Sequence, residues 1–286
     1  MLFGKKYNEY KPEKLPTSRR EQFFDLLTHN YLLLLFLGFV FLFTFLPMFI
    51  CIFIRDFYFA SYMAMYQREE ITQEQLVSLT TSLLHTMNII ISSSFIFTSI
   101  SFAGVSKIYR HLIWTEPIFL FRDFLKGIKE NIVKILLFDL VIIASIYGLY
   151  SLNMIPIDIW IVKYLPFAIF ACIVIAVYLH FILQINIYNQ KGLMLVKNCF
   201  AVYFRSPLIT LLFVALLFLV ILLANIINVI LIKFIVFCAL TLFLLPIYLL
   251  IWFLLDINIL DKCVNKELFK EVYRKGLHEE TTNEES

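Results

Sequence analysis

The sequence has few charged residues and little glycine or proline. Only 16% of its 286 residues are Asp, Glu, Lys or Arg, whereas about 25% is usual in a soluble domain. This low charge excludes an ordinary cytosolic enzyme, and a net charge of +3 is too small to indicate nucleic acid as a partner. The 7 Gly and 8 Pro leave the apolar runs almost free of helix breakers. The broken helices that form ion sites in many transporters are therefore not expected.

Short motifs of catalytic or metal sites are also missing. The five cysteines are scattered and include no Cys-x-x-Cys pair, so they do not indicate a disulfide framework. The five histidines lie far apart, with no His-Glu-x-x-His and no carboxylate at ligand spacing. No Walker A, Gly-x-Gly-x-x-Gly or Gly-x-Ser-x-Gly motif occurs. We therefore predict no enzyme activity, no metal and no cofactor.

Long apolar runs dominate what is present. Hydrophobic residues make up 61% of the chain and include 31 Phe. Six runs are long enough to cross a hydrocarbon core of about 30 Å as helices. They cover, approximately, residues 31–54, 84–105, 132–154, 159–185, 208–230 and 232–256. The first run follows a polar N-terminal segment and is too long for a cleavable signal peptide. The sequence predicts an all-α polytopic membrane protein with six transmembrane helices and short amphipathic interfacial helices on the cytoplasmic side.

Basic residues are concentrated in alternate connections. The two tails and the second and fourth connections hold 20 Lys and Arg, and the other connections hold 4. Because Lys and Arg favour the cytoplasmic side of a membrane, both termini are expected to be cytoplasmic. We expect a basic N-terminal segment at 1–30, a six-helix membrane domain at 31–260 and a tail at 261–286. The acidic end of the tail is expected to be disordered.

Two basic connections have helical patterns of their own. Residues 119–131 read FLFRDFLKGIKEN and residues 192–207 read GLMLVKNCFAVYFRSP. Each segment places apolar residues on one helical face and polar residues on the other. In the first segment Asp123 is expected on the polar face. Both segments predict amphipathic helices at the cytoplasmic interface.

The connection at roughly 57–82 is the only sizeable one expected on the extracytoplasmic side. Thr72 and Gln75 have the spacing of a capping box, which predicts a helix that begins there and continues into the second span. The acids Glu69, Glu70 and Glu74 outnumber the single base of this connection.

Polar residues inside the predicted spans are the candidate functional residues. Asp139 lies about two turns into the third span, where a carboxylate costs about 2.5–3.5 kcal/mol on insertion scales. This cost makes Asp139 a functional candidate. The alternative is that Asp139 reaches the headgroups or pairs with a base such as Lys134. Asp256, at the end of the last span, is expected at the membrane boundary.

Two further groups of polar residues lie in the second and fourth spans. His180 and Gln184 share one face of the fourth span, either to form hydrogen bonds between helices or to line a hydrophilic path. The second span is the most polar, and the candidates within it are Ser92, Ser93 and Ser94. Small hydroxyl residues favour close helix packing, so this span is expected to be central, although a pore lining would use the same residues.

Three segments resemble a family of bacterial membrane proteins. They are NYLLLLFLGFVFLFTFLP at residues 30–47, FTSISFAGVSKIYRHLIWTEPIFLFRDFLKGIKENIVKILL at 97–137, and QKGLMLVKNCFAVYFRSPLITLLF at 190–213. In order and spacing over most of the chain they resemble the YesL-like family, whose function is unknown. The proline usual in the second segment is missing, and the extracytoplasmic connection is longer than in that family.

The resemblance implies a bacterial cytoplasmic membrane and an accessory role beside a carbohydrate ABC importer, because members tend to be encoded beside such importers. The first hypothesis is therefore a non-catalytic interaction subunit whose partners are the lipid bilayer, a carbohydrate ABC permease and its binding protein. The alternative is an autonomous small-solute transporter or channel that uses Asp139, His180 and the Ser-rich second span. The candidate interfacial or partner-contact residues are Arg122, Asp123, Phe124, Lys126, Lys197, Arg205, Glu69, Glu70 and Glu74.

Overall fold

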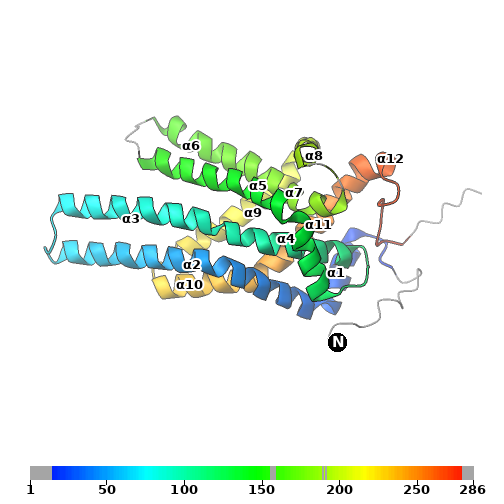
Figure 1. Ribbon diagram of the computed structural model, residues 1–286, viewed down its shortest axis with the longest axis horizontal. Coiled ribbons are helices and arrows are strands. Elements are labelled where there is room, and N and C mark those ends of the chain that lie inside the picture. Colours follow the sequence, from blue (N-terminus) through cyan, green and yellow to red (C-terminus); the bar gives the residue numbers. More distant parts are fainter. Residues whose placement is uncertain (1–14, 155–158, 189, 191, 279–286) are drawn as a thin grey trace, which may run out of the picture.

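The described residues form a bundle of long helices without a strand (Figure 1). The computed structural model describes residues 15–154, 159–188, 190 and 192–278. Six helical stretches are long and apolar enough to cross a membrane, which confirms the predicted number of spans. They are Tyr31–Gln67, Gln73–Ile113, Leu120–Leu149, Tyr164–Ile187, Pro207–Asn225 and Ile230–Leu268.

The spans are built from the following elements. The first half of the chain holds α1 (Arg19–His29), α2 (Tyr31–Gln67), α3 (Gln73–Ser94), α4 (Ile96–Ile113) and α5 (Leu120–Met154). The second half holds α6 (Trp160–Ile169), η3 (Phe170–Ile175), α7 (Ala176–Ile187), α8 (Gly192–Arg205), α9 (Pro207–Asn225), α10 (Ile230–Ala239), η4 (Leu240–Leu244), α11 (Leu245–Leu260), η5 (Asp261–Asn265) and α12 (Lys266–Leu268). The three η elements are π-helical turns.

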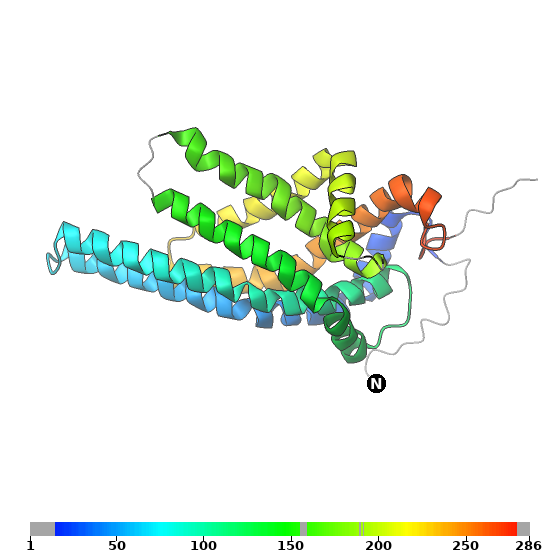
Figure 2. The same ribbon diagram turned by 45° about the horizontal axis from the view of Figure 1, so that its top comes forward.

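Both described chain ends lie at one end of the bundle, here called the termini end (Figure 1). The backbone N–H of His278 donates to the carbonyl of Pro16 at 3.0 Å, which places the two ends side by side. The connections α2–α3 and α9–α10, the last residues of α5 and the first residues of α6 lie at the opposite end, called the hairpin end (Figure 2). The basic residues Lys5, Lys6, Lys11, Lys14 and Lys191 and the acidic end of the tail at 279–286 lie outside the described residues.

The α2–α3 hairpin reaches farther toward the hairpin end than any other pair of helices (Figures 1 and 2). The 37 residues of α2 span about 55 Å, well beyond the roughly 30 Å of a hydrocarbon core. The start of α3 is the predicted capping box. The Gln75 backbone N–H donates to Thr72 Oγ1 at 3.3 Å, and the Thr72 N–H donates to Gln75 Oε1 at 2.9 Å. The helix α2 therefore continues beyond the predicted first span, 31–54.

The stretch that contains α3 and α4 is the centre of the bundle. In its most apolar window 56% of the residues are buried, more than in any other span, which confirms that the second span is central. α4 packs against α2, α5 and α7. Its close approach to α5 requires glycine, because a Cβ on Gly127 would lie 2.6 Å from the carbonyl oxygen of Ala103.

Only one of the two predicted interfacial helices forms a separate helix. Residues 120–130 do not form a separate helix but are the first turns of α5, since no helix breaker separates them from the third span. The connection before them is only 114–119, and Asp123 points inward with 2% exposure instead of lying on the polar face. α8 is a separate helix that lies across the bundle axis (Figure 2). Its outer side chains include Leu193 and Phe204, which are 90% and 69% exposed.

α1 and the C-terminal residues cover the termini end. α1 packs against α11. The Gln22 amide donates to the carbonyl oxygens of Ile113 at 2.7 Å and Gly276 at 3.3 Å. Gly276 has φ +85°, and a Cβ there would lie 2.1 Å from the Ile113 oxygen, so only glycine fits this turn.

Candidate functional site

A His–Asp pair lies buried among three spans. His180 in α7 contacts Asp256 in α11, with Nδ1 2.8 Å from Oδ1. The other ring nitrogen, Nε2, is 3.1 Å from Oγ1 of Thr210 in α9. All three residues are 0% exposed. We call His180, Asp256 and Thr210 the core triad. Asp256 was predicted at the membrane boundary; its carboxylate is buried and faces α7, which no sequence pattern indicated.

Two protonation states of the core triad satisfy these hydrogen bonds. When His180 carries both ring protons, Nδ1–H donates to Asp256 and Nε2–H donates to Thr210, whose own hydroxyl donates to the Ser206 carbonyl at 3.0 Å. When Nε2 is unprotonated, it accepts a hydrogen bond from the Thr210 hydroxyl. Ser206 then still accepts from the Thr210 backbone N–H at 3.3 Å. The triad can therefore exchange one proton without moving its heavy atoms.

Three polar atoms of Asp256 and Gln184 have no hydrogen-bond partner among the described residues. They are Oδ2 of Asp256 and both Oε1 and Nε2 of Gln184, and all are buried. Gln184 is one helical turn from His180 on the same face of α7. Trp252 closes the other side, with its ring centroid 4.9 Å from that of His180 and its indole N–H donating to the Leu179 carbonyl at 2.9 Å.

Asp139 forms a second buried polar site between α4, α5 and α7. Oδ2 of Asp139 accepts a hydrogen bond from the Ser99 hydroxyl, and the Tyr178 side chain interacts with the same carboxylate. Asp139 is 0% exposed, so the alternative in which it reaches the headgroups is wrong. Its Oδ1 has no hydrogen-bond partner among the described residues. Tyr178 lies two residues before His180, so α7 contributes to both buried sites.

The serines of α3 do not join these sites through the hydrogen bonds of the described residues. Ser92 and Ser94 are buried, and their hydroxyls donate to the carbonyls of Asn88 and Ile91 in their own helix. Ser93 is exposed. Hydroxyls bonded to their own helix allow close packing and add no polar lining.

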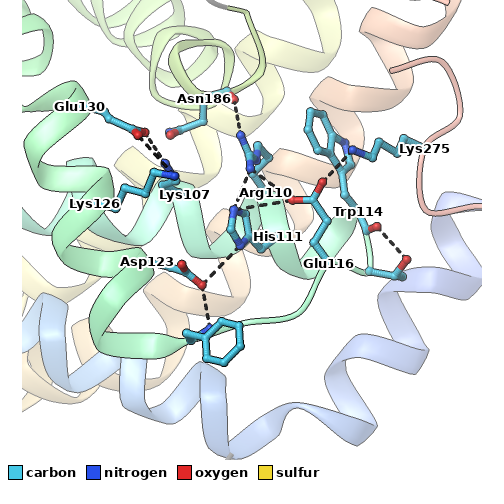
Figure 3. Close-up of polar contacts among 12 residues, drawn as sticks. Lys107, Arg110, His111, Trp114, Glu116, Asp123, Lys126, Glu130, Asn186 and Lys275 are labelled. Atoms are coloured by element: carbon cyan, nitrogen blue, oxygen red, sulfur yellow. Dashed lines mark hydrogen bonds and ion pairs between the residues drawn. The ribbon is translucent and has the colours of Figure 1, made fainter. Parts of the chain in front are cut away.

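A charged network joins the helix ends at the termini end (Figure 3). Arg110 in α4 donates through Nη2 to Glu116 Oε2 at 3.2 Å and to His111 Nε2 at 2.7 Å. Because Nε2 accepts this bond, the ring proton of His111 lies on Nδ1, 3.5 Å from Asp123 Oδ2. Lys275, near the C-terminus, donates to Glu116 Oε1 at 2.7 Å. We call Arg110, His111, Glu116, Asp123 and Lys275 the terminal network.

An indole ring and a perturbed carboxylate belong to the same network. Arg110 and Lys275 lie 5.0 Å and 4.2 Å from the Trp114 ring centroid, within the range of cation–π attraction. Burial on its own raises the pKa of the Glu116 carboxyl. The hydrogen bond from Lys275 and the charges of Arg110 and Lys275 outweigh burial, so the pKa of Glu116 is below its ordinary value. The network therefore ties the C-terminal residues to the α4–α5 connection.

A neighbouring group of polar residues links α4, α5 and α7 (Figure 3). Lys107, 4% exposed, pairs with Glu130, which Lys126 approaches to 3.9 Å. The Asn186 amide donates to Ser106 Oγ at 2.7 Å, and its carbonyl oxygen accepts from Asn131 at 2.7 Å. These contacts hold the helix ends together.

The remaining predicted contact residues lie in three separate places, the start of α5, α8 and the hairpin tip. Arg122 stacks over Phe119 at 3.9 Å, and Phe124 packs against Gly104. Lys197 is exposed on α8, and Arg205 donates to the Cys263 carbonyl at 2.6 Å. The exposed acids at the hairpin tip are Glu69, Glu70 and Glu74.

The described residues contain no group of three His, Cys, Asp or Glu that could hold a metal ion. No protein-family model, curated protein or solved structure matches this chain. The resemblance to the YesL-like family therefore stays a prediction. What the described side chains can do chemically is to bind and release a proton at a buried pair.

Proposed function

We propose that the chain is an autonomous membrane transporter that carries protons by way of the core triad. The observation that carries this proposal is the pairing of His180 with Asp256 at zero exposure inside three membrane spans. Ionisable residues inside spans are costly and typically mark proton relays or substrate paths. The second ring nitrogen of His180 can gain or lose a proton while Nδ1 keeps its contact with Asp256.

Proton binding at the triad changes a hydrogen bond between helices. His180, Asp256 and Thr210 belong to three different spans, and the hydrogen bond between His180 and Thr210 changes direction when one proton enters or leaves. The proton comes from bulk water and returns to it, so no other reactant is required. A change in this bond alters the free energy with which α7 and α9 hold together. Such a shift between packing arrangements is how a transporter exposes a site alternately.

The proposal is tested with purified protein in vesicles that contain a pH-sensitive dye. An inward pH gradient should acidify vesicles with the wild-type chain faster than empty vesicles. Asp256→Asn and His180→Gln should each reduce this rate at least tenfold, and Asp139→Asn tests the second buried site. Glu70→Gln, an exposed carboxylate at the hairpin tip, is the matched control and should leave the rate unchanged. Proton uptake that Asp256→Asn and His180→Gln do not alter would refute the proposal.

A second candidate is the accessory subunit of a bacterial carbohydrate ABC importer, with both termini cytoplasmic. The observation that favours it is the projecting α2–α3 hairpin. Its exposed side chains combine Tyr58 and Val77 with the acids of the tip at Glu69, Glu70 and Glu74. A permease or its binding protein would contact this projection. Tagged chain purified from native membranes should then recover the permease, and the triple change of these acids to Gln should reduce recovery. Repeated recovery of the chain alone contradicts this role.

A further inference from the structure

The outer face of α8 exposes large apolar side chains. α8 lies across the bundle axis (Figure 2), so it runs parallel to a membrane that the spans cross. Its inner side chains Leu195 and Cys199 are buried against the bundle, whereas Leu193, Met194 and Phe204 are 90%, 59% and 69% exposed. An apolar face of this kind on a helix in the membrane plane is typical of contact with the boundary between headgroups and acyl chains.

Two cations lie on the same outer face, with a small residue between them. Lys197, Ala201 and Arg205 follow one another at intervals of four residues, so they share one stripe of the helix. All three residues are exposed. The Cα atom of Ala201 lies about 6 Å along the helix axis from that of each cation. Because Lys and Arg have long side chains and Ala has a short one, both cations can reach a group that sits over Ala201.

The positive charge of this stripe is not balanced within α8, which contains no Asp or Glu. Lys197 forms no ion pair with any residue that the structure describes. Arg205 donates through Nη1 to the Cys263 carbonyl at 2.6 Å, which holds its guanidinium beside η5. This is its one hydrogen bond to a described residue, so its other N–H groups can bind an anion.

We propose that the outer face of α8 binds a phospholipid of net negative charge from the leaflet at the termini end. The headgroup phosphate sits over Ala201 between Lys197 and Arg205, and the acyl chains contact the exposed apolar side chains of α8. Those apolar side chains favour a lipid over a soluble phosphate compound. Two cations without an acid on the helix favour an anionic headgroup over a zwitterionic one. This surface is separate from the core triad, so the inference does not depend on proton transport.

The first test is native mass spectrometry of the full chain in detergent, with phosphatidylglycerol and phosphatidylcholine as the probes. The wild-type chain should bind phosphatidylglycerol at least tenfold more tightly. Lys197→Gln changes no contact with a described residue, so the variant should fold and reduce this preference about fivefold. Arg68→Gln, 72% exposed at the hairpin tip, is the matched control and should leave the preference unchanged. Equal binding of the two lipids by the wild-type chain, or an unaltered preference in Lys197→Gln, overturns the inference.

A second pair of variants adds a group between the cations. Ala201→Glu places a carboxylate at this exposed position, and Ala201→Gln places a neutral side chain of similar size there. Ala201→Glu should abolish the preference for phosphatidylglycerol, and Ala201→Gln should retain most of it. Equal losses in the two variants contradict an electrostatic contact. Excess inorganic phosphate should not displace phosphatidylglycerol from the wild-type chain, and displacement would identify a site for soluble phosphate compounds instead.

Discussion

Replacing one or both partners of the buried His180–Asp256 pair distinguishes its contribution to stability from its contribution to proton transport. Asp256→Leu leaves a buried imidazole beside the apolar ring of Trp252, and His180→Phe leaves a buried carboxylate without a partner. The double variant leaves neither. Leu and Phe are chosen because they fill space similar to the groups that they replace, so that cavities contribute little.

The expected magnitudes follow from the burial of the pair. Both residues are 0% exposed, so each single substitution leaves an uncompensated polar or charged group and should cost about 3–5 kcal/mol of unfolding free energy. Replacing both partners removes the unpaired group. The double variant should therefore be neutral or more stable by about 1–4 kcal/mol. Thr210 loses His180 but keeps its bond to the Ser206 carbonyl.

The measurement is reversible unfolding in mixed micelles, with SDS as the denaturant and far-ultraviolet circular dichroism as the readout. Proton uptake into vesicles is measured on the same preparations. If the pair serves proton binding, the double variant is stable and inactive. A double variant whose loss of stability equals the sum of the two single losses would refute the reasoning, because the pair would then not be coupled.

Four further changes test other parts of the fold. Gly127→Ala should lower stability in the same SDS titration by about 1–3 kcal/mol through overpacking, whereas Gly148→Ala in the same helix meets no atom within 4 Å and should be neutral. Thr72→Ala removes a helix cap worth about 0.5–2 kcal/mol, and faster amide exchange at Gln75 should report its loss. Because the pKa of Glu116 is lowered from 4.5, its contribution to stability is present above pH 4.5 and is lost as the pH falls through the folded-state value. In SDS titrations, the loss of stability between neutral and acidic pH should be smaller in Glu116→Gln than in the wild-type chain. Tags at the two chain ends should be accessible from the same side of the membrane, and a reporter inserted at 68–72 from the other side; tags on opposite sides would contradict an even number of spans.

Hydropathy alone predicts the number of spans because an apolar run of sufficient length has one stable arrangement in a bilayer. Composition also predicts the central position of the second span, since its hydroxyl side chains suit contact with other helices and not lipid. The capping box at Thr72 is predictable for a similar reason, because both of its hydrogen bonds form between residues three apart in the chain. These features depend on local sequence.

The core triad and the inward position of Asp123 depend on contacts between distant segments. His180 and Asp256 are 76 residues apart, and nothing in the sequence around Asp256 distinguishes a carboxylate that faces headgroups from one that faces α7. Thr210 follows Pro207 by three residues, and a threonine in the first turn of a span indicates no special role. Asp123 lies on the polar face of an isolated helix. Once residues 120–130 continue into α5, that face turns toward His111 and the termini end.

The core triad and the surface of the bundle are connected through the start of α9. Ser206 is the N-cap residue of α9 and follows α8, the helix that lies across the bundle axis. The Thr210 hydroxyl donates to the Ser206 carbonyl when His180 is doubly protonated, and turns to His180 when the proton leaves. Proton binding thus strengthens one hydrogen bond at the α8–α9 junction and proton release weakens it. If the triad exchanges protons as proposed, the Thr210 hydroxyl links that exchange to the residue that joins α8 to α9.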